Sequence, residues 1–283
     1  VGPRREDGYH PLATVFQAVS VYEDVTARPA DALRLTVVGT QADQVPTDAT
    51  NLAVRAAELL ARTAGVEPLV HLHLVKGVPV AGGMAGGSAD AAAALVACDA
   101  LWGTGLSRAA LSDLAATLGA DVPFALLGHT AVGSGRGDVL SSALSRGQYH
   151  WALALRRTGL STPSVFARFD EIDGPRASDE PEPDVALLAA LRSADLEAVG
   201  RALGNDLQAA ALELAPELAG TLEVAEGAGA LGVLVSGSGP TVAALARTRA
   251  HALSIAAALT AAGVADDVLC ASGPVPGARV VAG

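Results

Sequence analysis

Two kinds of hydrophobic patterning along the chain predict a protein that mixes strands and helices. Apolar and polar residues alternate strictly over residues 70–75 and more loosely over residues 13–27 and 32–39, which is typical of β-strands. Short apolar runs at residues 152–155 and 231–246 also predict strands, the second run being interrupted by a glycine-rich loop. Alanine- and leucine-rich segments predict helices at residues 51–65, 88–101, 107–119, 185–194, 196–203, 215–226 and 249–262.

An acidic, proline-rich stretch is the clearest linker in the chain. Residues 173–184 (DGPRASDEPEPD) have no apolar period. Because the strand expected at residues 152–155 opens a second half of the pattern, we place a boundary near residue 150. This predicts an N-terminal domain of residues 1–150 and a C-terminal domain of residues 151–283.

The composition narrows the classes of protein that fit this pattern. Of the 283 residues, 51% are hydrophobic and 17% are charged, which is too apolar for a disordered chain, and no apolar run reaches the roughly 18 residues of a membrane span. The net charge of -11 disfavours a general nucleic-acid binder. Cys98 and Cys270 have neither disulfide-framework nor metal-ligand spacing, and the first residues lack a signal-peptide pattern. We therefore expect a cytoplasmic protein without membrane or nucleic-acid partners.

The segment PVAGGMAGGSADAA, at residues 79–92, carries the strongest signal for a bound ligand. Four glycines lie between a predicted strand and a predicted helix, where backbone N–H groups can converge on an anion at the positive end of the helix dipole. Ser88 can cap that helix or offer its hydroxyl to a phosphate or a metal. A tight strand-to-helix turn is the structural alternative. The segment matches neither the P-loop nor the Rossmann fingerprint, so it predicts a third kind of phosphate loop.

A second glycine cluster, SGSGPT at residues 236–241, lies between two short apolar runs. By itself it is equally typical of a turn. Paired with the first glycine segment, it predicts the opposite wall of one cleft between the domains.

Asp121 is the candidate for acid–base chemistry. It follows the end of a predicted helix, and Pro123 biases Val122 towards extended geometry, so we expect Asp121 to be held on a fixed turn. An isolated aspartate at such a place is more often a helix cap or an Asx turn. In kinases, however, an aspartate beside the acceptor hydroxyl orients it and takes its proton.

Three aromatic or imidazole side chains are candidates for binding a planar ligand. Tyr9 and His10, in the polar turn RREDGYH, could stack on and hydrogen-bond to a base, although a surface Tyr-His pair usually has no such role. Phe166 ends the segment STPSVF, which we interpret as a short polar turn, and could stack on a ligand or pack in the core.

Four further polar residues have two interpretations each. His71 and His73 share one face of a predicted strand but have no third ligand at useful spacing, so we expect a half-exposed strand face rather than a metal site. Lys76, the only lysine in the chain, could reach an ATP phosphate or only solubilise a strand end. Asn51 could cap a helix or contact adenine.

Together these motifs resemble the superfamily of small-molecule kinases that includes galactokinase, homoserine kinase, mevalonate kinase and phosphomevalonate kinase (GHMP kinases). The resemblance rests on PVAGGMAGGSADAA paired with SGSGPT. Within this superfamily, DGYHPL, NLAVRAAELL, GADVPFAL and GLSTPSVF are similar to segments of the 4-diphosphocytidyl-2-C-methyl-D-erythritol kinase family. The match covers nearly the whole chain, with the motifs in the expected order.

The resemblance implies an α+β fold, with an N-terminal domain like the second domain of ribosomal protein S5, a C-terminal ferredoxin-like domain and the site between them. It implies transfer of the γ-phosphoryl group of ATP, with Mg²⁺, to the 2-hydroxyl of a cytidine-diphosphate-linked methylerythritol. This reaction belongs to the non-mevalonate route to isoprenoid precursors.

The resemblance also assigns residues to roles, beginning with Asp121 as the catalytic base. It makes the ATP phosphate loop Pro79, Val80, Ala81, Gly82, Gly83, Met84, Ala85, Gly86, Gly87, Ser88 and Ala89, with Asn51 and Lys76 as further candidates for contact with ATP. The cytosine would be held by Tyr9, His10 and Phe166, and Thr162 lies in a matching segment that lines the site.

One departure from the family pattern concerns the start of the chain. The family opens with a segment of the type Pro-Ala-Lys-Val-Asn-Leu, whose lysine assists the aspartate, and this chain begins downstream of it. We therefore expect the catalytic lysine upstream of Val1, and Lys76, which matches a different family position, is not its substitute. Two alternatives stay open: another GHMP kinase such as homoserine kinase, and a catalytically silent nucleotide-binding protein descended from such a kinase.

Overall fold

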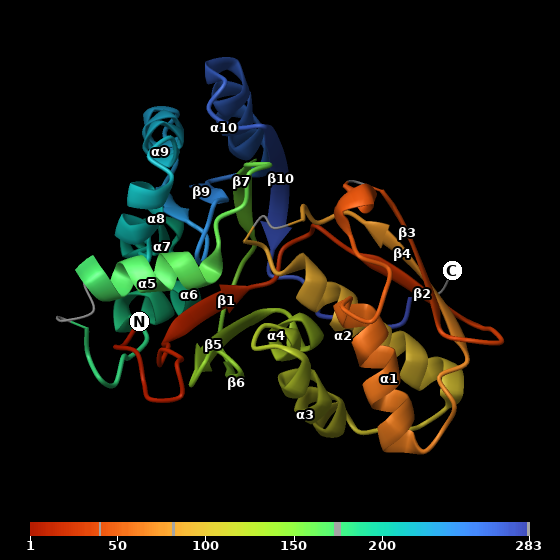
Figure 1. Cartoon of the computed structure of the whole chain (residues 1–283). Coiled ribbons are helices and arrows are strands. Elements are labelled where there is room, and N and C mark those ends of the chain that lie inside the picture. Colours follow the sequence, from red (N-terminus) through yellow and green to blue (C-terminus); the bar gives the residue numbers. More distant parts are fainter. Residues whose placement is uncertain (40, 81–82, 173–176, 282–283) are drawn as a thin grey trace. The chain divides into compact units, whose positions relative to one another are not determined.

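The chain forms two compact units in the computed structural model, which describes residues 1–39, 41–80, 83–172 and 177–281 (Figure 1). Unit 1 comprises Val1–Ser20, the described part of residues 81–84, and Thr130–Val275. Unit 2 comprises Val21–Val80, Ala85–His129 and the described residues from Pro276 onwards. Since these units alternate along the sequence, they follow other limits than the single boundary near residue 150, which stays a prediction.

Unit 2 is built on a three-stranded sheet with the strand order β2-β4-β3. Its central strand, β4, is antiparallel to β2 and parallel to β3. The elements are β2 (Asp24–Pro29), β3 (Arg34–Gly39), η1 (Ala42–Gln44), α1 (Leu52–Ala64), β4 (Val70–Lys76), α2 (Gly86–Trp102), α3 (Arg108–Leu118) and α4 (Val122–Leu127).

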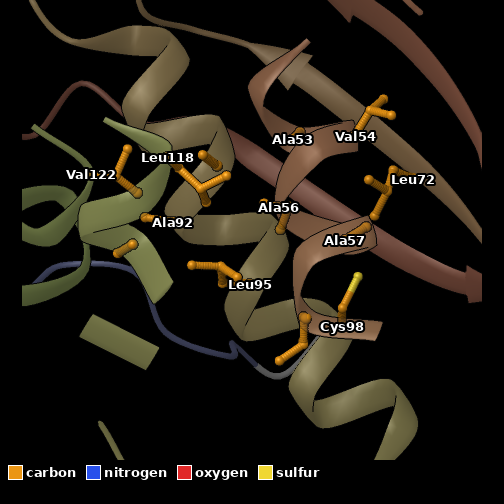
Figure 2. Packing of buried hydrophobic residues seen from close by; sticks show 14 of the residues in the cluster. Ala53, Val54, Ala56, Ala57, Leu72, Ala92, Leu95, Cys98, Leu118 and Val122 are labelled. Atoms are coloured by element: carbon orange, nitrogen blue, oxygen red, sulfur yellow. The ribbon is translucent and has the colours of Figure 1, made fainter. Parts of the chain in front are cut away.

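The core of unit 2 follows from the period-2 pattern of β4 and the alanine content of α1 and α2. Leu72 and Leu74 are fully buried, and each stabilises the fold by about 1.5–3 kcal/mol through removal of its side chain from water. His71 and His73 lie on the other face, half-buried, and the hydroxyl of Thr36 hydrogen-bonds to both rings. Mostly small side chains of α1 and α2 pack together with Leu95 in this core (Figure 2): Ala53, Ala56, Ala57, Ala92 and Cys98.

Unit 1 contains a four-stranded antiparallel sheet with the order β10-β7-β9-β8 and a three-stranded sheet with the order β1-β5-β6. The strands are β1 (Thr14–Gln17), β5 (Thr130–Ser134), β6 (Val139–Ser142), β7 (Tyr149–Leu155), β8 (Gly232–Val235), β9 (Val242–Ala246) and β10 (Asp267–Gly273). The helices are α5 (Thr162–Ile172), α6 (Val185–Ser193), α7 (Leu196–Ala202), α8 (Gln208–Leu214), α9 (Leu218–Gly227) and α10 (Arg249–Ala262). The core lies where Ala152 and Ala154 of β7 and neighbouring residues of β9 pack against buried residues of α5, α8, α9 and α10.

Most helix limits agree with the sequence predictions because the capping residues are local. Asn51 caps the start of α1 and Gly65 ends it with φ +67°, while Ser107 and Thr248 cap α3 and α10. The mixed content confirms the α+β class.

Three sequence predictions of local structure are wrong. Residues 13–27 do not form one strand, since β1 and β2 belong to different units. The segment STPSVF is not a polar turn, because α5 begins at Thr162. Val122 is not extended, because α4 begins there. In both helices proline lies in the first turn, where its missing N–H breaks no helical hydrogen bond.

Candidate active site

The glycine segment leads into α2, whose N-terminus lies in unit 2. Ala85 has φ +54°, and no side-chain hydrogen bond of the described chain caps the helix there. Ser88 lies in the first turn and therefore does not cap α2, contrary to one of its two sequence interpretations. The first-turn N–H groups have no intrahelical acceptor, so this end of α2 is suited to an anion.

The two glycine segments meet within unit 1. Gly83 has φ +69°, and a Cβ atom on it would lie 2.5 Å from the carbonyl oxygen of Gly239. Hydrogen bonds from Ser236 N to Thr241 O and from Gly239 N to Ser236 O, each 2.8 Å, close the second segment into a turn. Gly83 therefore has to be glycine for both its backbone conformation and this close approach. Ala81 and Gly82, which the sequence assigns to the phosphate loop, lie outside the described residues.

A cavity of about 230 Å³ also lies in unit 1. Met84 of the first glycine segment and Ser236 and Thr241 of the second are among the residues that line it. The remaining lining comes mainly from apolar residues of β1, β7, α6 and α7.

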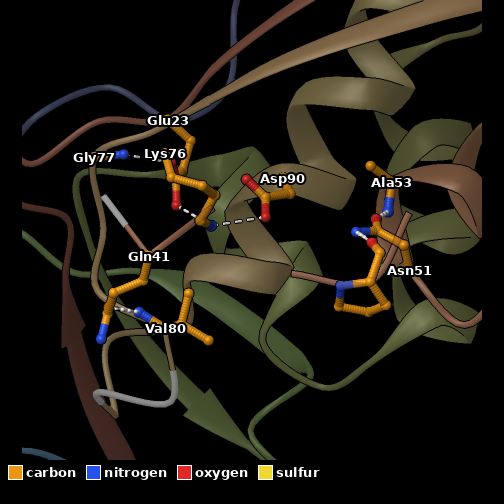
Figure 3. A network of polar contacts seen from close by, with 9 residues as sticks. Glu23, Gln41, Asn51, Ala53, Lys76, Gly77, Val80 and Asp90 are labelled. Atoms are coloured by element: carbon orange, nitrogen blue, oxygen red, sulfur yellow. Dashed lines mark hydrogen bonds and ion pairs between the residues drawn. The ribbon is translucent and has the colours of Figure 1, made fainter. Parts of the chain in front are cut away.

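Lys76 is the centre of a buried polar network in unit 2 (Figure 3). Its ammonium group contacts the carboxylates of Glu23 and Asp90, at 2.8 Å for Asp90 Oδ2, and all three side chains are nearly inaccessible to water. Glu23 also accepts a 2.8 Å hydrogen bond from the N–H of Gly77. The interpretation of Lys76 as a solubilising residue at a strand end is therefore wrong. The network joins the end of β4 and the residue before β2 to α2.

Burial sets the protonation properties of this network. Desolvation raises the pKa of Glu23 and of Asp90, although the Lys76 ammonium opposes the rise at both. Asp90 Oδ1 is buried and has no hydrogen-bond partner among the described residues. Two carboxylates facing one ammonium carry an excess negative charge when all three are ionised.

Asn51 uses both ends of its side chain within unit 2 (Figure 3). Its Oδ1 accepts from Ala53 N at 2.8 Å, and its Nδ2 donates to the carbonyl oxygen of Pro46 at 2.8 Å. The structure shows the helix-cap role. Contact with adenine remains a prediction.

Replacing Asn51 by Ala should lower the free energy of unfolding by about 1–2 kcal/mol, because α1 loses its cap. Asn51→Asp keeps the capping oxygen, so its free energy of unfolding should fall clearly less. Urea unfolding measures both values. If Asn51 only caps α1, the KM for ATP will be the same in Asn51→Asp and wild type, whereas a rise in that KM would support an adenine contact.

Asp121 precedes the first residue of α4. It has φ −86° and ψ −11°, and its side chain makes no capping hydrogen bond within the described chain, so the helix-cap alternative is not observed. The residue retains exposed surface, whereas desolvation by the surrounding protein raises the pKa of its carboxyl group above the usual value. A carboxyl group of this kind is available for proton transfer.

Side chains on one face of α5 contact two of the other sequence motifs in unit 1. Thr162, Phe166 and Asp170 are four residues apart on this helix and therefore share one face. Phe166 stacks on the ring of His10 with 4.7 Å between centroids, and Asp170 Oδ1 lies 2.8 Å from His10 Nε2. Thr162 Oγ1 lies 2.9 Å from Ser238 Oγ in the second glycine segment. This face thus connects the DGYHPL and SGSGPT motifs.

Family models match both halves of the chain. The N-terminal domain of the GHMP kinases matches residues 51–129, and the C-terminal domain of the GHMP kinases matches residues 187–265. A 4-diphosphocytidyl-2-C-methyl-D-erythritol kinase from Leifsonia xyli subsp. xyli is 54% identical over 99% of this chain and 94% of its own length. The chain belongs to this family of GHMP kinases. It is therefore an ATP-dependent small-molecule kinase.

Further relatives of this GHMP kinase agree in sequence and in fold. A protein of the same name from Thermobifida fusca is 55% identical over 99% of this chain and 94% of its own length. A crystal structure of 4-(cytidine 5'-diphospho)-2C-methyl-D-erythritol kinase has a TM-score of 0.78 and 33% identity, covering 96% of this chain and 93% of that one. A homoserine kinase from Cytophaga hutchinsonii has a TM-score of 0.73 at 20% identity, which supports the GHMP kinase fold alone.

The sequence prediction did not include three residues of this GHMP kinase that contact predicted site residues. Asp170 could have been found from its spacing to Phe166, but only if residues 162–172 had been recognised as a helix. Glu23 has no such signal, since it meets Lys76 only through the pairing of β2 with β4. Tyr9 contacts Arg136, whose cation the sequence did not single out.

In residues 1–39, 41–80, 83–172 and 177–281, no three His, Cys, Asp or Glu side chains come together as a group that could hold a metal ion. None of the described helices combines the length and the apolar character that crossing a membrane requires.

Proposed function

We propose that this kinase transfers the γ-phosphoryl group of ATP to the 2-hydroxyl of 4-diphosphocytidyl-2-C-methyl-D-erythritol, in the non-mevalonate route to isoprenoid precursors. The observation that carries the proposal is the shared face of α5, on which Phe166 and Asp170 hold His10 while Thr162 reaches the second glycine segment. This arrangement offers aromatic surface and polar atoms suited to a cytosine base. The names of relatives about half identical over nearly the whole chain support the same acceptor.

Unit 1 supplies the acceptor-binding residues in this proposal. His10 is 9% exposed and is fixed by Asp170 and Phe166, so its ring is oriented before a ligand arrives. Tyr9 is 53% exposed and offers ring surface for stacking on the base. Fixing these groups in advance lowers the entropy lost on binding.

Unit 2 supplies the catalytic base and the helix terminus for the phosphates. Asp121 accepts the proton of the acceptor hydroxyl, and its raised pKa makes it a stronger base than an ordinary aspartate. Residues 79–89 form the phosphate loop in this proposal, and the backbone N–H groups of Gly86, Gly87 and Ser88 in the first turn of α2 donate to the phosphates of ATP. Pro79 has no N–H, and those of Val80 and Ala89 already donate to Gln41 Oε1 and Ala85 O. The donors in the first turn of α2 let a chain with a net charge of -11 bind a polyphosphate.

The residues present are compatible with Mg²⁺ as the cofactor of this reaction. Kinases bind Mg²⁺ through a few protein oxygens together with the phosphates, so a cage of three carboxylates is not needed. The half-buried hydroxyl of Ser88, in the first turn of α2, would supply a protein ligand. When bound, Mg²⁺ neutralises charge on the phosphates.

The domain boundary and the cellular location are also part of the proposal. The boundary near residue 150 lies between the two matched family models, at residues 51–129 and 187–265. A cytoplasmic location fits the free thiols of Cys98 and Cys270.

A comparison of two acceptor substrates, each supplied alone, tests this function. The full-length protein is incubated with ATP, Mg²⁺ and either the cytidylyl acceptor or homoserine, and ADP release is measured. We expect release with the cytidylyl acceptor only. Release with homoserine alone would identify a different GHMP kinase, and release with neither acceptor would favour a silent nucleotide-binding protein.

A further inference from the structure

The turn between β5 and β6 places a guanidinium group against the ring of Tyr9. Arg136 Cζ lies 4.9 Å from the centroid of that ring, within the range of a cation–π contact. Both residues belong to unit 1. We infer that Arg136 is a positioning residue of the acceptor site, which holds the Tyr9 ring in the orientation that receives the nucleobase. This inference rests on the proposed function and names a residue to which that function assigns no role.

The backbone of Tyr9 is already fixed, but the direction of its ring is not. Hydrogen bonds from Arg5 N to Tyr9 O, from Gly8 N to Arg5 O and from Tyr9 N to Asp7 Oδ1 close the turn around it. None of these bonds acts on the side chain. A half-exposed tyrosine ring without a contact on its face would rotate among rotamers and would lose that freedom on binding a base. The guanidinium of Arg136 restricts this rotation.

Arg136 is in turn fixed by Asp138. Its Nη2 and Nε donate to Asp138 Oδ2 at 2.8 and 3.2 Å, and its backbone N–H donates to Asp138 Oδ1 at 3.1 Å. These bonds orient the planar guanidinium, which a lysine could not reproduce. Asp138 also neutralises the positive charge of Arg136. Arg136 therefore acts on the Tyr9 ring more through the flat shape of its guanidinium group than through a free positive charge.

The turn that carries Arg136 is attached to the segment that carries Tyr9. Leu12 N donates to Gly135 O at 2.8 Å, and Gly137 N donates to Ser134 O at 2.9 Å. Gly133 and Gly137 leave room for the Phe16 ring, since a Cβ atom on Gly133 would lie 2.6 Å from Phe16 Cε2. The two segments therefore keep the Arg136 guanidinium and the Tyr9 ring in fixed positions relative to each other.

Four variants of the full-length protein test the inference: Arg136→Ala, Arg136→Lys, Tyr9→Ala and the double variant Tyr9→Ala/Arg136→Ala. Steady-state kinetics gives the KM for the acceptor, the KM for ATP and kcat, and calorimetry gives the Kd for cytidine 5′-diphosphate as a probe. Arg201→Ala, which removes an exposed cation of α7, is the matched control.

We expect Arg136→Ala to raise the acceptor KM and the Kd for cytidine 5′-diphosphate about tenfold. This factor corresponds to the free-energy cost of ordering one side chain, the Tyr9 ring, on binding. The KM for ATP and kcat should stay within about twofold, and Arg201→Ala should match wild type. Arg136→Lys should behave as Arg136→Ala. In the Tyr9→Ala background, Arg136→Ala should add nothing, because Arg136 acts through Tyr9.

Three results would overturn the inference while leaving the proposed function intact. They are an unchanged Kd in Arg136→Ala, full activity in Arg136→Lys, and additive losses in the double variant. The latter two would show direct contact of the cation with the ligand. If wild type neither binds cytidine 5′-diphosphate nor phosphorylates the cytidylyl acceptor, the proposed function fails and the inference fails with it.

Discussion

Asp121→Asn should lower kcat about 10²–10⁴-fold, the range that general base catalysis contributes. The amide keeps the shape of the side chain but cannot accept the proton of the acceptor hydroxyl. Because Asp121 has no capping role in α4, the free energy of unfolding should change little. The KM for ATP should also be retained. Steady-state kinetics and urea unfolding of the same preparations measure these effects.

The pH profile of the wild type gives an independent signature of Asp121. The reaction needs the ionised carboxylate, so kcat should fall as the pH drops through its pKa. Since desolvation by the surrounding protein raises that pKa, the fall should begin at a higher pH than for an ordinary aspartate. The residual activity of Asp121→Asn should lack this acidic limb.

Asp113→Asn is the matched control for both measurements. Asp113 is an exposed residue of α3, in the same unit, so its replacement removes one negative charge without touching the proposed base. Its kcat should equal that of wild type. If Asp121→Asn retains more than about a tenth of wild-type kcat, another group takes the proton and the assignment is wrong.

Lys76→Met should lower the free energy of unfolding by about 3–5 kcal/mol near neutral pH, because it leaves two buried carboxylates without their counter-ion. Urea unfolding measures this loss. Arg55→Met removes an exposed cation of α1 in the same unit and should change stability by less than about 0.5 kcal/mol. The triple variant Lys76→Met/Glu23→Gln/Asp90→Asn should recover most of the loss, because no buried charge remains.

The cost of Lys76→Met should depend on pH with a definite sign. Desolvation raises the pKa values of Glu23 and Asp90 in the folded protein above those of ordinary glutamate and aspartate side chains. A group with a raised pKa in the folded state contributes stability below its unfolded pKa and loses it as the pH rises through its folded pKa. The variant should therefore approach wild type in acid and become progressively less stable than wild type as the pH rises through the raised pKa values of the two carboxyl groups. Equal stability of the two proteins at pH 8 would contradict the ion-pair role of Lys76.

Lys76 also shows why a residue type does not define a role. In the sequence it leads into a glycine segment and could have reached a phosphate. In the structure its ammonium group contacts two carboxylates, one on α2 and one just before β2. Its observed contribution is to join the end of β4 to α2 and to the residue before β2, and direct contact with ATP remains a prediction.

The sequence by itself determined those features that depend on a few neighbouring residues. Asn51 and Gly65 limit α1 because capping hydrogen bonds and left-handed backbone are local properties. The alternation in β4 and the glycine segment before α2 were visible for the same reason. The family resemblance came from these local motifs and is confirmed by the comparisons.

Only the tertiary structure decided which distant residues meet. His10 and Asp170 are 160 positions apart, and Lys76 and Glu23 are 53 apart, so strand pairing and helix packing must bring each pair together. Proline misled the sequence analysis at α4 and α5, because its preference for the first turn of a helix appears only once the helix is known to continue. The contact of Arg136 with Tyr9 has the same origin: local sequence specifies each of their turns, but only packing places the cation on the ring.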